Sequence, residues 1–137
     1  MKTRTGFSAI FLLAVSGLIL TSCGKTPRPE INLVELGLED SRVATAGDEL
    51  HIEAEIVAEG VIDVITVELH MEEEGGEEIE GTFDEYSGLK NTLFHSHLEI
   101  PEGTTPGTYH FHMTVTDLEG YQASVEAEVT IEQPSGK

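Results

Sequence analysis

Disulfide bonds cannot stabilise this chain, because its 137 residues include a single cysteine, Cys23. Tryptophan is absent altogether. A glycan-binding platform would need exposed aromatic side chains, and only Tyr86 and Tyr121 are plausible candidates for that role. The composition therefore excludes a disulfide scaffold and gives little support to a sugar-binding surface.

Basic residues are also scarce. The chain has 7 Lys and Arg residues against 26 Asp and Glu residues, which gives a formal net charge of −19 at pH 7. All 26 acidic residues but only five of the basic ones follow residue 22, so that part of the chain has a formal charge of −21. Nucleic acids and anionic lipid headgroups bind basic surfaces and are poor partners for it, whereas cations are favoured.

The longest apolar run, residues 6–20, is too short for a membrane span. Lys2 and Arg4 precede it, which is the arrangement of a secretory signal peptide. The run ends in Leu20-Thr21-Ser22-Cys23, which resembles the bacterial lipobox, where the cysteine is diacylated and becomes the new N-terminus after cleavage. We therefore predict a lipoprotein signal peptide over residues 1–22 and a lipidated tether over residues 23–30. The alternative is that Cys23 is a free thiol.

A lipid anchor at Cys23 implies a location in the cell envelope. The next residue is Gly24 rather than Asp, which by resemblance favours the outer membrane. No acidic run follows Cys23 directly, so the periplasmic and surface faces of that membrane both stay open.

Residues 31–133 have the length of one domain, followed by a C-terminal tail over residues 134–137. Apolar and polar residues alternate with a period of two, and turn residues interrupt the alternation at the intervals of an all-β sandwich. We predict about seven antiparallel strands and no helix. The predicted core contains Leu50, Ile52, Ile56, Val67, Leu69, Phe94, Leu98, Tyr109, Phe111, Val115, Val125 and Val129.

The segment over residues 72–88 is acidic and rich in glycine, which predicts an exposed hairpin or loop. A calcium-binding loop is the functional alternative, but the segment lacks the spaced Asp and Asn residues of an EF-hand. A solvated run of charges is the interpretation that its composition favours.

Four of the six histidines form two His-x-His pairs, His95/His97 and His110/His112. Successive residues of a strand point to opposite faces of the sheet. Apolar neighbours such as Phe94 and Phe111 take the inner face, so both pairs are expected on the outer faces of their strands.

The segment from Gly107-Thr108-Tyr109 to Thr116-Asp117 resembles bacterial immunoglobulin-like domains, whose sixth strand often follows a Gly-x-Tyr start. Together with the lipobox and the segment Pro101-x5-Gly-x-Tyr-His-Phe-His, it makes the chain resemble uncharacterised immunoglobulin-like lipoproteins of Gram-negative gut anaerobes. The resemblance covers nearly all of residues 23–137. It implies an immunoglobulin-like antiparallel sandwich but no established activity.

In immunoglobulin topology the second strand pairs with the fifth and the third pairs with the sixth. This order would gather the histidines into two groups at the same end of the domain. The first group, on one outer face, is His51, His95 and His97. The second group, on the opposite outer face, is His70, His110 and His112.

Each group is a candidate metal site. Residues i and i+2 of a strand are about 6.5 to 7 Å apart and cross-strand partners about 4.5 to 5.5 Å apart, so three imidazoles can converge on one ion. Neutral imidazole suits zinc, copper or nickel, and three of them leave a position for water or a carboxylate. We predict that zinc or copper is the bound ion. The neighbouring carboxylates are Glu53, Glu99, Glu68 and Glu72.

Three other interpretations of the histidines stay open. Outward strand positions are polar in any case, and His fills them acceptably. The histidines would also suit a pH sensor. If the strands that carry His95 and His112 were neighbours instead, the two pairs would form one site of four imidazoles, with His51 and His70 outside it.

Nothing in the sequence favours catalysis, because it lacks a nucleophile elbow, a phosphate-binding loop and a free cysteine nucleophile. Ser96 lies between two histidines, but alternation points it into the core. We predict a protein that is not an enzyme, uses no organic cofactor and binds no nucleic acid.

Two functional hypotheses remain for the chain. The first is an envelope lipoprotein that captures or hands over zinc or copper. The second is a metal-independent interaction or scaffold module, accessory to an outer-membrane receptor or a glycan-utilisation system. In either case the predicted partners are the membrane, through Cys23, and an envelope protein.

Overall fold

The alternating pattern forms strands in the computed structural model, which describes residues 24–73 and 75–136. Over these residues the only helical element is a 3-10 turn, η1 (Leu38–Asp40). The strands are β1 (Glu30–Leu36), β2 (Val43–Thr45), β3 (Glu49–Val57), β4 (Ile62–Met71), β5 (Glu78–Phe83), β6 (Asn91–Glu99), β7 (Gly107–Asp117) and β8 (Gln122–Glu132). The all-β prediction is therefore confirmed.

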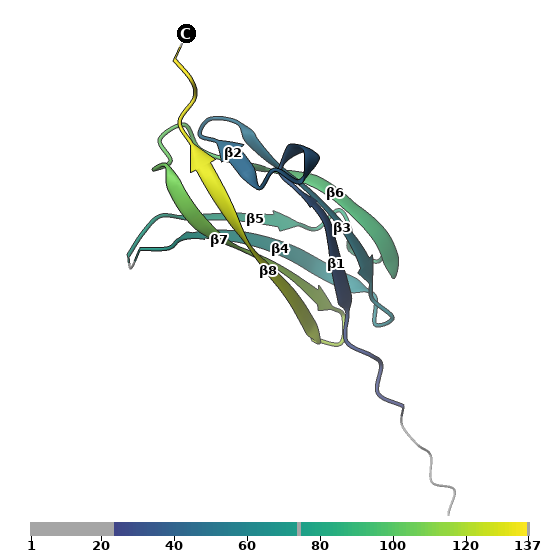
Figure 1. The fold of residues 1–137 in the computed structure, drawn as a ribbon. Helices are drawn as coiled ribbons and strands as arrows, with labels where there is room; N and C mark the ends of the chain where they lie inside the picture. The colour runs from purple at the N-terminus through teal and green to yellow at the C-terminus, as the bar shows by residue number, and fades with distance from the viewer. Residues whose placement is uncertain (1–23, 74, 137) are drawn as a thin grey trace, which may run out of the picture.

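The strands form two sheets that pack face to face (Figure 1). One sheet has the order β1-β3-β6, and the other has the order β2-β8-β7-β4-β5. All neighbours are antiparallel except β2, which runs parallel to β8. The sequence did not predict the short strand β2, because three residues are too few for a visible alternation.

The core lies between the sheets and matches the prediction closely. Eleven of the twelve predicted residues are buried, and Val125 is only partly buried. Val125 lies in the first half of β8, whereas β2 covers only the far end of that strand, from Thr130 to Glu132. The open edge beside Val125 explains its exposure.

The acidic segment over residues 72–88 is less exposed than predicted. Its middle part forms β5, which pairs with β4 along its whole length. Ile79 and Phe83 on this strand are each 8% exposed and belong to the core. The segment forms a strand despite its high charge, because its glutamates take the outer positions and its apolar residues take the inner ones.

Tyr109, near the start of β7, bonds back to the loop that precedes this strand. Its hydroxyl donates to the carbonyl oxygen of Thr105, four residues upstream, at 2.7 Å, as in the tyrosine corner of immunoglobulin folds. Glu77 joins this contact by accepting from the amide of Thr105 at 2.9 Å. Burial, reinforced by the negative charge of Glu77, raises the pKa of the Tyr109 phenol above its ordinary value of about 10.

The predicted signal peptide over residues 1–22 and the predicted lipidation site Cys23 lie outside the described residues and stay predictions. Residues 24–29 are extended and lead into β1 at one end of the sandwich, whereas the C-terminus leaves from the opposite end (Figure 1). Among the residues that the structure describes, no helix has the length and apolar character needed to cross a membrane.

Candidate metal site

The first predicted group of histidines assembles on the outer face of the β1-β3-β6 sheet. Strand β3 pairs with β6 as predicted, and His51 is the direct partner of His97, while Glu53 is the partner of His95. The apolar neighbours Leu50 and Leu98 are buried on the inner face. The register of one strand pair therefore brings together three imidazoles that lie far apart in the sequence.

Nitrogen atoms of these three side chains lie within 4.8 Å of one another. The Nδ1 atom of His51 is 3.3 Å from the Nε2 atom of His97. The ring centroid of His51 is 4.9 Å from that of His95 and 5.2 Å from that of His97. We name His51, His95 and His97 the histidine triad. A zinc ion held by the triad would lie about 2.0 to 2.1 Å from each of the three nitrogens.

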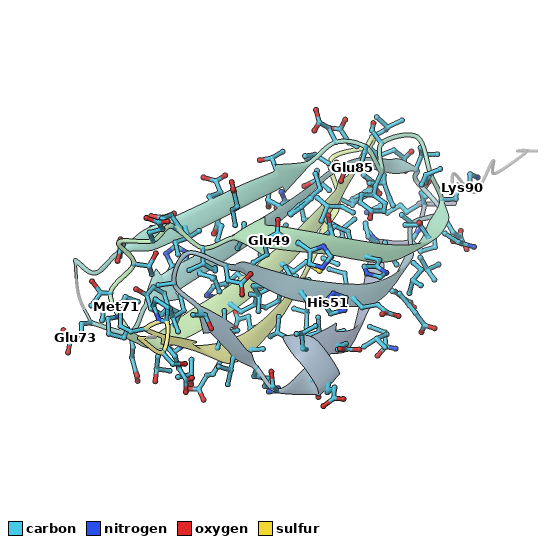
Figure 2. All side chains as sticks on the ribbon, turned by 90° about the horizontal axis from the view of Figure 1, so that it is seen from above. Glu49, His51, Met71, Glu73, Glu85 and Lys90 are labelled. Carbon is cyan, nitrogen blue, oxygen red and sulfur yellow. The ribbon has the colours of Figure 1, made fainter. Side chains whose placement is uncertain are left out.

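The histidine triad is buried on one side and open on the other. His51 is 9% exposed, whereas His95 and His97 are exposed. Figure 2 shows His51 near the middle of the molecule, with Glu73 and Glu85 toward opposite ends. An ion at this site would contact one buried imidazole and two exposed ones, and would have a direct path from solvent.

Glu35 is the functional candidate that sequence reasoning missed. Its Oε1 atom lies 3.8 Å from Nε2 of His51, and Glu35, His51 and Glu53 form a second group of possible ligands. Alternation from Ile31 and Leu33 would place Glu35 in the core, but a bulge between Leu33 and Glu35 shifts the register of β1. A glutamate at an expected inner position, followed by the buried Leu36, is the sequence signal for such a bulge.

Tyr86 holds the backbone of β6 at the histidine triad. Its hydroxyl donates to the carbonyl oxygen of His95 at 3.0 Å and accepts from the amide of the same residue at 3.2 Å. Its ring packs against Phe94, with a centroid distance of 4.9 Å. The backbone N–H and C=O groups of His95, at the open edge of β6, are thereby both hydrogen-bonded.

The second predicted group lies on the outer face of the other sheet but is arranged differently. His70 is the direct partner of His110 in β7, and the rings of His70 and His112 are 5.5 Å apart. The possible ligands around His70 are carboxylates, because Glu68 and Glu78 complete the group that the described residues form there.

Each of the other imidazoles of this group has a different neighbour. His112 lies 3.3 Å from a carboxylate oxygen of Glu126, and His110 is paired in register with Glu128. The sequence missed Glu78, because residues 72–88 were interpreted as a loop. Ring nitrogens of His70 and His112 therefore lie beside separate carboxylates, Glu68 and Glu126.

The two His-x-His pairs do not form one site. Strand β6, with His95 and His97, belongs to the three-stranded sheet, and β7, with His110 and His112, belongs to the five-stranded sheet. The alternative of a single site of four imidazoles is therefore wrong, and the connection over residues 100–106 carries the chain from one sheet to the other.

A family model described as "Domain of unknown function (DUF4625)" matches residues 21–132. No curated protein sequence matches the chain. Among solved structures, a Niemann-Pick type C2 protein from Japanese carpenter ant is similar with a TM-score of 0.52 and 6% identity, over 80% of this chain and 96% of that one. At this identity the similarity shows a shared β-sandwich fold and nothing more.

Two further structures have TM-scores below 0.5. A superoxide reductase (neelaredoxin) from Ignicoccus hospitalis has a TM-score of 0.45 and 12% identity, over 78% of this chain and 82% of that one. Spo0M, a sporulation control protein from Bacillus subtilis, has a TM-score of 0.46 and 12% identity, over 77% of this chain and 50% of that one. Neither contributes to the assignment of the site.

Proposed function

Since this chain belongs to the DUF4625 family of domains of unknown function, we propose a function from the site itself: the protein binds one zinc or copper ion through His51, His95 and His97. The observation that carries the proposal is the convergence of three imidazoles, with nitrogens within 4.8 Å of one another. A strand face that only has to be polar does not require three imidazole nitrogens to converge.

The donor set selects the class of metal. Imidazole suits zinc and copper, whereas calcium and magnesium prefer oxygen ligands. Three imidazoles leave a position for water or a carboxylate, and Glu53 is placed to supply one, since it is the register partner of His95. The strongly negative chain adds a general attraction for cations.

The openness of the site supports a role in capture or handover. His95 and His97 are exposed, so an ion can be transferred to or from another molecule without unfolding of the domain. Together with the lipobox at Cys23, this supports an envelope lipoprotein, anchored to the outer membrane, that binds a metal ion and passes it to an envelope partner. The proposed role is binding rather than catalysis, and it uses no organic cofactor.

A metal-independent interaction module is the competing proposal. It is favoured by two exposed apolar side chains on the same outer face, Leu93 and Val57, which are 51% and 44% exposed. Such residues would contact a protein partner without any ion.

The deciding experiment is calorimetric titration of the protein, purified without a His tag, with zinc and with copper above pH 7, where imidazole is mainly neutral. We expect one ion per chain. Metal at about 100 times its dissociation constant should also stabilise the fold by about 2.7 kcal/mol, because only the native state has the assembled site. Absence of both effects would reject the metal-binding function and leave the interaction module.

A further inference from the structure

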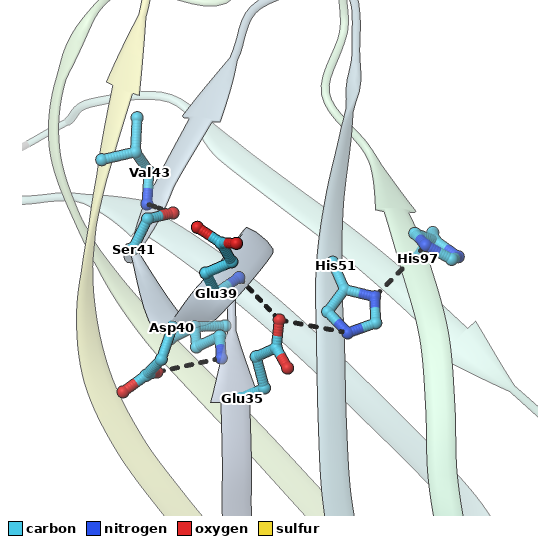
Figure 3. A network of polar contacts seen from close by, with 8 residues as sticks. Glu35, Glu39, Asp40, Ser41, Val43, His51 and His97 are labelled. Carbon is cyan, nitrogen blue, oxygen red and sulfur yellow. Dashed lines mark hydrogen bonds and ion pairs between the residues drawn. The ribbon is translucent and has the colours of Figure 1, made fainter.

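The two ring nitrogens of His51 face different partners. Nδ1 points toward His97, with a separation of 3.3 Å to Nε2 of that residue. Nε2 points the other way, toward Oε1 of Glu35, with a separation of 3.8 Å (Figure 3). Only one nitrogen of a neutral imidazole carries a proton, so the group beside Nε2 influences whether Nδ1 is free to bind a metal.

Glu35 is itself held in place by the turn that follows β1. The same oxygen, Oε1, accepts a hydrogen bond from the backbone amide of Glu39 at 2.7 Å (Figure 3). The turn is closed by a bond from the amide of Leu36 to the carboxylate of Asp40 at 3.2 Å. The amide of Gly37 donates to the carbonyl oxygen of His51 at 2.8 Å, which joins the turn to β3 at the triad itself.

Glycine is required at the start of this turn. Gly37 has a φ of 76°, and a Cβ atom there would lie 2.8 Å from Oγ of Ser41 and 3.0 Å from the amide nitrogen of Arg42. The bulge in β1, the glycine and the turn η1 therefore act together to bring one carboxylate oxygen to the buried side of His51.

From this geometry we propose that Glu35 is a positioning residue of the metal site: it accepts a hydrogen bond from Nε2–H of His51 and so holds the Nδ1 lone pair toward the ion shared with His95 and His97. This inference rests on the proposed function. Metal-binding histidines generally donate their second N–H group to a carboxylate or carbonyl oxygen, which fixes the tautomer and ring orientation.

The distances fit such a role. At 3.8 Å the two atoms are an ion-pair distance apart, and a movement of about 1 Å brings them to hydrogen-bond length. The side chain of His51 is only 10% exposed, so it has little freedom to turn away. The side chain of Glu35 is 30% exposed. Water competes weakly for this contact, in contrast to the exposed side of the triad.

Direct coordination is the competing role for Glu35, because it also forms a possible ligand group with His51 and Glu53. The two roles differ in what replaces the carboxylate. An amide oxygen at position 35 can still accept from the Glu39 amide and from His51, but it is a poor ligand for zinc or copper. Glu35→Gln and Glu35→Ala therefore separate positioning from coordination.

The test measures the zinc dissociation constant by chelator competition, and the copper(II) spectrum by electron paramagnetic resonance, for the parent, Glu35→Ala, Glu35→Gln and the control Glu55→Ala. Glu55 lies on the same sheet face and bonds to Asn32 rather than to the triad. We expect Glu35→Ala to weaken zinc binding by about 10- to 100-fold with one ion per chain retained. Glu35→Gln should restore most of the affinity, the copper spectrum should keep its nitrogen ligands, and the control should bind like the parent.

A second measurement reports on His51 without metal. Long-range 15N–1H correlations of the imidazole ring should show the Nε2–H tautomer in the parent and a mixture of tautomers in Glu35→Ala. If the parent binds metal and Glu35→Ala matches it in affinity and tautomer, the positioning role is wrong although the proposed function stands. Loss of binding in both Glu35 variants with a changed copper spectrum would identify Glu35 as a ligand instead. A parent that binds no metal overturns both proposals.

Discussion

The hydroxyl of Tyr86 bonds to both backbone groups of His95, donating to its carbonyl oxygen at 3.0 Å and accepting from its amide at 3.2 Å. Strand β6 is the edge of its sheet, so these groups have no neighbouring strand to bond with. One side chain thus satisfies both backbone groups of His95 at the open edge of the sheet.

Replacing Tyr86 with Phe should therefore destabilise the protein by about 1 kcal/mol, because the ring still packs on Phe94 while both hydrogen bonds are lost. Urea unfolding measures the change, and hydrogen exchange should show faster exchange at the amide of His95. Tyr121→Phe is the control. Equal exchange at His95 in the Tyr86 variant and the parent would show that the bond does not protect the edge.

The double substitution His95→Gln/His97→Gln should abolish metal binding. Gln keeps a polar side chain at each exposed strand position, so the stability of the metal-free protein should hardly change, whereas the gain of about 2.7 kcal/mol at 100 times the dissociation constant should disappear. Melting temperatures with and without zinc provide the measurement.

The matched control for that prediction is His110→Gln/His112→Gln. These imidazoles lie on the other sheet, where their neighbours are His70, Glu126 and Glu128. We expect this variant to bind one ion with the affinity of the parent. Loss of binding in the control together with normal binding in His95→Gln/His97→Gln would move the metal site to the five-stranded sheet.

Tyr109→Phe should lower stability at neutral pH by about 1 kcal/mol, because the bond to the carbonyl oxygen of Thr105 is lost in a buried environment. The same residue predicts a pH dependence. Its phenol has a raised pKa in the folded protein, so above pH 10 the unfolded chain loses the proton while the folded chain still holds it. Stability contributed by Tyr109 is therefore complete below about pH 10 and falls as the pH rises further.

Unfolding measured between pH 9 and pH 11 tests this sign. The parent should lose stability more steeply than Tyr109→Phe over that interval, because the variant has no phenol to titrate at this position. Parallel curves for the two proteins would show that Tyr109 ionises equally in the folded and unfolded states.

The substitution Cys23→Ala should leave the protein unacylated and poorly anchored, if the lipobox is used. Metabolic labelling with a fatty acid and fractionation of membranes in the bacterial host provide the measurement. Unchanged labelling and membrane association would reject the lipid anchor. The metal affinity of the soluble variant should equal that of the parent, because Cys23 precedes the folded domain.

Much of the fold and of the triad could be predicted from the sequence because both follow from period-two alternation. That pattern places His51, His95 and His97 on outer positions, and the strand order of an immunoglobulin-like domain then makes β3 and β6 neighbours. Neither step requires knowledge of a side-chain conformation.

Two kinds of residue were missed: Glu78, whose strand β5 lies in a segment interpreted as a loop, and Glu35, where the backbone departs from regular alternation. Glu35 reaches the outer face only through the bulge in β1. The turn after β1, which the carboxylate of Asp40 closes, has no periodic signal in the sequence. The expected convergence of His70, His110 and His112 also depended on rotamers. In the structure His70 lies 3.2 Å from Glu68 instead, since a nearby carboxylate is available on the same strand.

The direction of β1 also determines how far the histidine triad lies from a lipid anchor at Cys23. The tether enters β1 at Glu30, whereas Glu35 and the histidine triad lie near its other end, about 17 Å farther along the strand at about 3.3 Å per residue. If Cys23 carries the proposed lipid, the triad therefore lies on the half of the domain that is farther from the anchor. A donor or acceptor arriving from the aqueous side would reach His95 and His97 before it met the headgroups.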